Sequence, residues 1–222
     1  VFHFISFFLR CHVPPFLIKR EKEIDKIDVI IGGPPCQAYS LVGRAQSSHM
    51  IVPMEDDPRN ELYKMYDVDN IIRVGSAGAF KDDINLKDIV IAQAACTDSN
   101  YMSQFKLPGT FAPVGDYNLI STAAGKAEDL GLNVRVGNIL STDSFYTYDP
   151  LDNDAWKRMG VLCVDMEAAA LYANAAALSK KALCMLTISD HLYKSEKLDA
   201  GERQEGFNDM IKLALEVAWT QK

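Results

Sequence analysis

The sequence lacks a long hydrophobic run, a metal-binding cysteine motif and an excess of positive charge. Of its 222 residues, 48% are hydrophobic and 24% charged, which fits a globular domain with ample core and excludes a disordered or disulfide-stapled chain. No apolar stretch approaches the roughly 18 residues that a membrane span needs. Lys and Arg total 23 against 30 Asp and Glu, a net charge of −7. We therefore expect neither a nucleic acid nor a membrane as partner.

The cysteines follow no CxxC or Cys/His metal spacing, so no metal site is expected. Their number is odd and most sit in apolar runs, which indicates reduced thiols in a cytoplasmic protein; they are Cys11, Cys36, Cys96, Cys163 and Cys184. Glycine is absent from residues 1–31. The apolar opening VFHFISFFLR has no basic segment before it and no small-residue cleavage site after it, so it is not expected to be a signal peptide.

The character of the chain changes near residues 66–70. Before this point, IDVII (27–31) predicts a buried strand, GGPPCQAYS a loop, and EDDPRNELYKMY (55–66) a helix. After it, apolar strands alternate with helices. The predicted strands are 71–79, 88–95, 134–141, 161–167 and 182–190, and the predicted helices follow Asp116, span 168–179 and follow Asp199. The last helix is expected to bury Phe207, Ile211, Leu215 and Ala218. This alternation predicts an α/β fold with three layers, α/β/α, around a mixed, largely parallel sheet.

Polar residues stand at the carboxyl ends of the predicted strands, where such folds place their sites. Arg73 and Ser76 flank a predicted turn of small residues and could bind an oxyanion; a structural ion pair at Arg73 is the alternative. Asp165 and Glu167 could bind a diol, or one of them could cap the next helix. Asp190 ends an apolar strand, where burial favours a protonated carboxyl that can donate a proton; it could instead be a helix cap. His191 beside it is more typical of a structural histidine than of a base.

Taken together, these segments resemble the bacterial hexameric purine nucleoside phosphorylases over residues 67–222. The matching motifs are IIRVGSAGA, ACTDS, RVGNILSTDSFY, VDMEAAALY, KALCMLTISDH and ERQEGFNDMIKLALE. The resemblance implies phosphorolysis of a purine nucleoside to purine and pentose 1-phosphate, with inorganic phosphate as co-substrate and no cofactor. It also implies a homo-oligomer.

The resemblance assigns roles to individual residues. Arg73 and Ser76 would hold phosphate, and Asp190 would protonate N7 of the leaving purine, assisted by Arg203. The nucleoside would contact Phe145 by stacking, Met166 beneath the sugar, Glu167 at the ribose hydroxyls, and also Asp165 and Ser189. The family usually has Glu where this chain has Asp165.

Residues 24–66 resemble a different family, the DNA cytosine-5 methyltransferases, through IDVIIGGPPCQAYS and EDDPRNELY. In that family the cysteine of PPCQ, here Cys36, attacks a flipped cytosine. The glycine-rich loop for the methyl donor, an ENV triplet and a target-recognition region are missing, so Cys36 is not expected to function. The chain thus reads as a chimera, with residues 1–23 unassigned. Two unrelated segments that meet without a linker favour an engineered recombinant.

The chimera hypothesis predicts a damaged enzyme. The phosphorylase phosphate loop and amino-terminal histidine are missing, so activity is expected to be strongly reduced or lost. The alternatives are a folded oligomeric scaffold without catalysis and, least favoured, a methyltransferase fragment. The strand at 27–31 is expected to lie beside 71–75, and residues 1–10 to add an edge strand or to contact another subunit.

Overall fold

The computed structural model describes residues 3–4, 29–32, 68–144, 150–199, 202 and 206–221. In chain order the elements are β1 (His3–Phe4), β2 (Val29–Gly32), β3 (Asn70–Ala79), β4 (Ile89–Thr97), η3 (Asn100–Phe105), α3 (Tyr117–Asp129), β5 (Val134–Ser141), α4 (Pro150–Arg158), β6 (Cys163–Asp165), α5 (Ala168–Ala177), β7 (Lys181–His191) and α7 (Asn208–Trp219). Strands and helices alternate through most of this order, as the sequence predicts. The predicted helix at 55–66 lies outside the described residues.

The strands form a mixed sheet that closes on itself. β3 pairs with β7, β7 with β4, β4 with β5, β5 with β6, and β6 returns to β3. The β3–β6 and β4–β7 pairs are antiparallel, whereas the other three are parallel. The prediction of a mixed, largely parallel sheet is therefore confirmed. Closure leaves these five strands with few free edges.

The amino-terminal strands extend the sheet from β3. β2 pairs in parallel with the first half of β3, with Ile30 opposite Ile71, and β1 pairs in parallel with β2. This confirms the expected place of strand 27–31 beside 71–75, and β1 supplies the expected edge strand.

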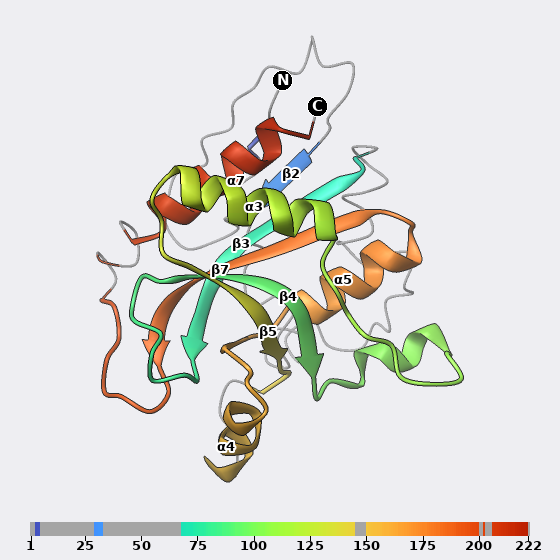
Figure 1. Cartoon of the computed structure of the whole chain (residues 1–222). Helices are drawn as coiled ribbons and strands as arrows, with labels where there is room; N and C mark the ends of the chain where they lie inside the picture. The colour runs from blue at the N-terminus through green and yellow to red at the C-terminus, as the bar shows by residue number, and fades with distance from the viewer. Residues whose placement is uncertain are drawn as a thin grey trace.

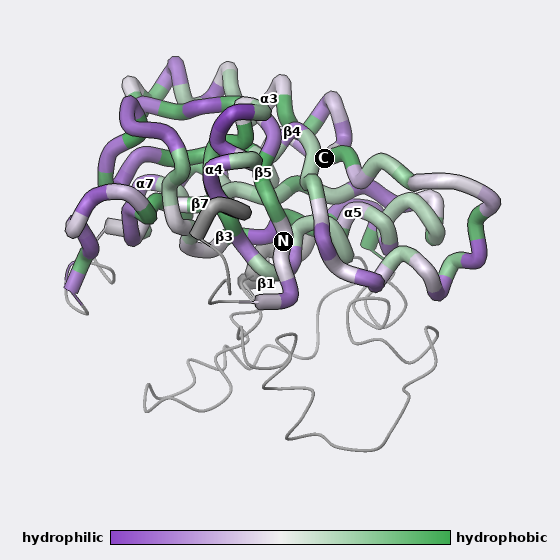
Figure 2. The backbone as a smooth tube through the Cα atoms, turned by 90° about the horizontal axis from the view of Figure 1, so that it is seen from below, coloured by the Kyte–Doolittle hydropathy of each residue, from purple (hydrophilic) through white to green (hydrophobic). Residues whose placement is uncertain are grey.

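Helices pack against both faces of the sheet (Figure 1). β7 shows why, because its side chains alternate between two hydrophobic clusters. Leu183 and Met185 pack with α3 and α7, whereas Cys184 and Leu186 pack with α5. Most of α5 is coloured hydrophobic in Figure 2, and eight of its residues are buried. The core therefore holds two layers of side chains, one on each face of the sheet.

Several local predictions are confirmed. Asp116 caps α3 by accepting the Leu119 N–H at 3.1 Å. Asp199 and Glu202 form the expected reciprocal capping box, with each side chain accepting the other residue's backbone N–H.

Two local predictions are wrong. The small-residue segment after Arg73 is not a turn, because β3 runs unbroken to Ala79 along β7. The strand predicted at 161–167 is only Cys163–Asp165. The prediction for α7 is only partly right. Ala218 is buried and Phe207 packs against the core as predicted, whereas Ile211 is half-buried and Leu215 exposed. The other buried residues of this helix are Met210, Leu213, Ala214 and Val217.

Among the described residues, no helix is both long and apolar enough to cross a bilayer. The described cysteines Cys96, Cys163 and Cys184 are free thiols.

Candidate functional site

A buried ion pair lies where β3 meets the start of α5. The Arg73 guanidinium, from the first half of β3, donates through Nη2 to Oε2 of Glu167. Arg73 is 6% and Glu167 1% exposed. Arg73 Nε and Glu167 Oε1 are buried and have no hydrogen-bond partner among the described residues. The pair therefore keeps one donor and one acceptor available, which is unusual for buried charged groups.

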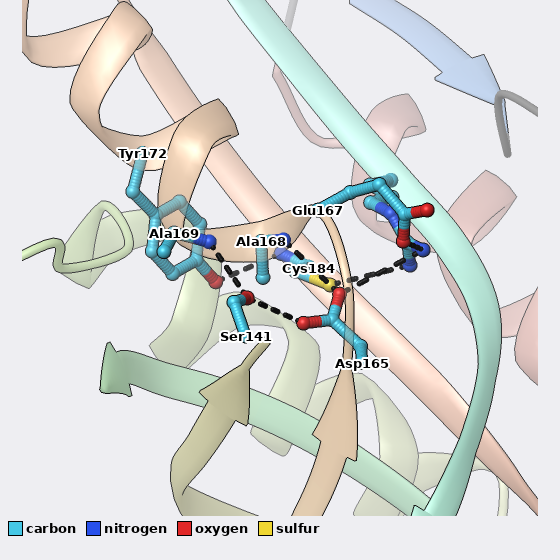
Figure 3. A network of polar contacts seen from close by, with 8 residues as sticks. Ser141, Asp165, Glu167, Ala168, Ala169, Tyr172 and Cys184 are labelled. Atoms are coloured by element: carbon cyan, nitrogen blue, oxygen red, sulfur yellow. Dashed lines mark hydrogen bonds and ion pairs between the residues drawn. The ribbon is translucent and has the colours of Figure 1, made fainter. Parts of the chain in front are cut away.

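Asp165 lies beside this pair but has other partners. Ser141, at the end of β5, donates its hydroxyl to Asp165 Oδ1, and the Ala168 N–H donates to Oδ2 at 3.0 Å. Arg73 Nη2 is farther away, 3.7 Å from Oδ2. Figure 3 shows Ser141, Asp165 and the first residues of α5 converging at this point. Asp165 is thus a hydrogen-bonded part of the framework at the β6–α5 connection.

The charged groups of this cluster shift one another's pKa values. Burial alone would lower the pKa of Arg73, but Glu167, Cys184 and Asp165 together raise it, so the guanidinium stays charged. Burial raises the pKa of Asp165 to about 6; Arg73 opposes this rise and Glu167 adds to it. The site thus holds one cation between two carboxylates, one of which can gain a proton in mildly acidic solution.

Tyr172, on α5, connects two strands next to the site. Its hydroxyl donates to the Ala92 carbonyl at 2.6 Å and accepts the Cys184 N–H at 3.0 Å. The β4–β7 pairing ends at Ile91 and Met185, so Tyr172 joins the two strands where their ladder stops. Cys184 in turn lies against Arg73, with Nη1 at 3.7 Å from Sγ. Sequence reasoning placed Ser141 at a candidate strand end but assigned no role to Ser141 or Tyr172, because only the fold shows their hydrogen-bond partners.

A gap in strand pairing runs along β3. β2 pairs with residues up to Arg73, and β6 pairs from Gly78 onward. Residues 74–77 therefore have no strand partner on that edge among the described residues. Ser76 is exposed, and strand alternation directs it to the face opposite Arg73. Arg73 thus lies at the border of the gap and Ser76 within it, and the two side chains predicted to hold an oxyanion together do not share a face.

Gly75 fits closely against the guanidinium. A Cβ at this position would lie 2.3 Å from Arg73 Nη1. A side chain there would push Arg73 away from Glu167, so the small residue is needed beside the ion pair.

The end of β7 carries the other predicted site residues. Ile188 pairs with Ala77 and Asp190 with Gly78, so Ser189 is the extra residue of a bulge. The Ser189 hydroxyl donates to Asp190 Oδ2 at 2.7 Å. Ser189 is buried and Asp190 half-buried. A bulge redirects side chains, which places Asp190 at the rim of the sheet.

His191 has a structural role. Its Nδ1 accepts the N–H groups of Tyr193 and Lys194, and Nε2 lies 3.1 Å from the Lys81 carbonyl. These partners assign the neutral tautomer with the proton on Nε2. The prediction that His191 is structural is consistent with this arrangement.

The remaining predicted residues are only partly placed. Met166 lies between Asp165 and Glu167 in the β6–α5 connection. Phe145, Arg203 and Cys36 lie outside the described residues. Among those described, no group of His, Cys, Asp or Glu has the arrangement of a metal site.

Comparison with known proteins identifies the class. A sequence model of the phosphorylase superfamily matches residues 43–219. The chain belongs to the phosphorylase superfamily.

Individual relatives narrow this class. The chain is 45% identical over 173 residues to the DeoD-type purine nucleoside phosphorylase of Shewanella denitrificans, covering 78% of this chain and 73% of the relative. It is 47% identical over 160 residues to the DeoD-type 2 enzyme of Vibrio cholerae (72% and 67%). It is 46% identical over 159 residues to the DeoD-type enzyme of Listeria welshimeri (72% and 68%). The phosphorylase homology predicted for residues 67–222 is therefore confirmed.

The chimera hypothesis finds no support. The superfamily match begins at residue 43, inside the segment 24–66 that we assigned to a methyltransferase. The matched relatives are phosphorylases. The boundary at residue 67 is therefore wrong, and the homology reaches farther toward the amino terminus.

Proposed function

We propose that the chain binds purine nucleosides and phosphate at the buried Arg73–Glu167 pair and performs phosphorolysis there. The observation that carries this proposal is that the pair has one buried donor and one buried acceptor without a hydrogen-bond partner among the described residues. Glu167 Oε1 can accept a ribose hydroxyl, and Arg73 Nε can donate to an oxyanion. The homology to purine nucleoside phosphorylases supports the same assignment.

Phosphate would lie along the unpaired edge of β3. Backbone N–H groups of 74–77 that face this edge offer donors to an anion, with Arg73 on one face of the strand and Ser76 on the other. Phosphate would attack C1′ of the ribose as the bond to the purine breaks, and the purine nitrogen would take a proton from Asp190. Glu167 would hold the hydroxyls of the developing oxocarbenium sugar. Met166, Phe145, Ser189 and Arg203 keep the roles that the resemblance gives them.

We further propose that phosphorolysis is much slower than in the relatives. The glycine-containing basic loop expected before β3 is missing from the sequence, and the loss of one transition-state charge contact costs on the order of a hundredfold in rate. A folded scaffold without catalysis is the second candidate, favoured by the direct contact between Arg73 and Glu167, which a substrate would have to loosen.

A phosphorolysis assay tests the proposal. Release of hypoxanthine from inosine and of adenine from adenosine is measured with and without phosphate, for the wild type and for Asp190→Asn. Phosphate-dependent release that the substitution abolishes would support slow phosphorolysis. Release equal in both proteins would favour the scaffold.

We also propose that the chain forms a homo-oligomer. Exposed apolar residues on separate elements support this, notably Tyr117 (78% exposed), Met159 (79%) and Trp219 (58%). Light scattering coupled to size-exclusion chromatography should give a mass above 24.7 kDa; a monomer would contradict it.

A further inference from the structure

The first turn of α5 is capped in an uncommon way. Glu167 is the N-cap residue of this helix, but its side chain makes no capping hydrogen bond. An N-cap side chain normally accepts one of the first backbone N–H groups. The acidic residue at the start of α5 therefore leaves the helix end to other groups.

Two residues from neighbouring strands supply the missing cap. Asp165 Oδ2 accepts the Ala168 N–H at 3.0 Å, and Ser141 Oγ accepts the Ala169 N–H at 3.0 Å. Ser141 also donates its proton to Asp165 Oδ1. The two side chains and two amides thus form one continuous network, shown in Figure 3.

Sheet register explains why Ser141 and Asp165 meet. They are paired positions at the ends of the parallel strands β5 and β6, and paired residues project to the same face. Both are buried, at 4% and 5% exposure. Both oxygens of Asp165 thus have a donor from the protein.

We propose that Ser141 and Asp165 are positioning residues for nucleoside binding, which cap α5 in place of Glu167 and so free the Glu167 carboxylate for Arg73 and the ribose. This inference rests on the proposed function, and it replaces the direct diol contact that the sequence suggested for Asp165. The shorter Asp, where the family usually has Glu, fits a carboxylate that turns back onto the helix end. Glu167 alone then recognises the sugar hydroxyls.

The test compares a nucleoside that has sugar hydroxyls with one that lacks them. Dissociation constants for adenosine and for 2′,3′-dideoxyadenosine are measured by isothermal titration on the intact chain. The variants are Ser141→Ala, Asp165→Asn and Glu167→Gln, and each of the first two combined with the third. Ser121→Ala and Asp129→Asn are matched controls, because both residues lie on the outer surface of α3.

Loss of a buried hydrogen bond predicts about a tenfold weaker adenosine affinity for Ser141→Ala and for Asp165→Asn. Affinity for the dideoxynucleoside should stay unchanged, since Glu167 has no hydroxyl to hold there. Neither substitution should weaken adenosine further when Glu167→Gln is present, because both act through that residue. The control variants should bind like the wild type.

Four results would overturn the inference. Equal weakening of both nucleosides would indicate a general structural role. Asp165→Asn that still weakens adenosine in the Glu167→Gln background, or a Ser141→Ala variant that binds normally, would indicate direct contact of Asp165 with the sugar. A wild-type chain that binds neither nucleoside at millimolar concentration would instead refute the proposed function, and the inference with it.

Discussion

Two regions of the site differ in how their charged groups are buried and paired. At the β6–α5 corner, formed by Arg73, Asp165 and Glu167, all three charged residues are buried and contact one another. At the β7 end, formed by Ser189, Asp190 and His191, the carboxylate is half-buried and accepts a hydrogen bond from the Ser189 hydroxyl. The corner has to balance its charges internally, whereas the carboxylate at the β7 end is partly open to solvent.

This difference in burial predicts that substitutions in the two regions affect stability to different extents. Removing one partner from a buried charge cluster leaves another charge without compensation, which is costly. A half-buried carboxylate at a strand end keeps part of its contact with water, so its solvation depends less on protein partners. We therefore expect substitutions at the corner to lower stability as well as substrate binding, and those at the β7 end to change mainly the rate.

Arg73→Met should have the largest effect on stability. It leaves Asp165 and Glu167 buried without their cation, and breaking such a cluster costs about 3–5 kcal/mol of unfolding free energy. Urea unfolding measures this change. Arg135→Met is the matched control, because its pair with Asp83 is exposed and should contribute less than about 1 kcal/mol. Equal losses in the two variants would contradict the contrast.

Tyr172→Phe should have the next largest effect. The substitution removes a hydroxyl that serves the Ala92 carbonyl and the Cys184 N–H, and buried groups left unpaired cost about 1–3 kcal/mol. Thermal or urea unfolding gives the value. Tyr193→Phe removes a hydroxyl from the exposed contact with Asp154 and should stay within about 0.5 kcal/mol. A similar loss in both variants would argue against a bridging role for Tyr172.

Stability should depend on pH differently through a buried carboxylate than through an exposed one. The pKa of Asp165 in the folded chain is about 6, above its ordinary value of 3.8, so the folded state binds a proton first as the pH falls below about 6. Through this group, acidification toward about pH 4 stabilises the fold, by on the order of 1 kcal/mol. The wild type should therefore gain stability relative to Asp165→Asn between pH 7 and pH 5 in urea unfolding.

The exposed carboxylate of Asp83 has a pKa shift of the opposite sign. Its hydrogen bond with Arg135 lowers the pKa of Asp83, so its contribution is present above the ordinary pKa and disappears in stronger acid. The Asp83→Asn variant should therefore show no relative change between pH 7 and pH 5. A wild-type curve parallel to that of Asp165→Asn over this interval would contradict the raised pKa.

Asp190→Asn should have the smallest effect on stability, within about 0.5 kcal/mol. The same substitution should lower any phosphorolysis rate by about 10²–10⁴-fold, because it removes the proposed proton donor. Unfolding and initial-rate measurements on one preparation test both statements. A large loss of stability with an unchanged rate would reverse the roles of the two regions.

The sequence predicted the elements well because their patterns are local. The apolar run of β7, the Asp116 cap and the Asp199–Glu202 box depend on neighbours within a few residues. The segment after Arg73 was misjudged because its glycines favour a turn locally, whereas pairing with β7 keeps it extended. On α7, two apolar stripes compete, and only the packing partner selects one of them.

The site was predicted only in part for a related reason. Arg73 and Glu167 stood out because charged residues at the ends of apolar strands are uncommon. Ser141 carried no such signal, since its meeting with Asp165 depends on the register between β5 and β6. The role of Asp165 likewise depends on which donors the fold brings to its two oxygens.

The closed ring of strands also bears on how the chain folds. Arg73 and Cys184 lie on neighbouring strands although 111 positions separate them in the sequence. During synthesis β3 must wait for β7, its longest partner, until most of the chain has left the ribosome. The β3–β7 pairing is therefore a long-range contact that local helix formation cannot replace. Until it forms, the edge of β3 that will face β7 lacks its partner strand.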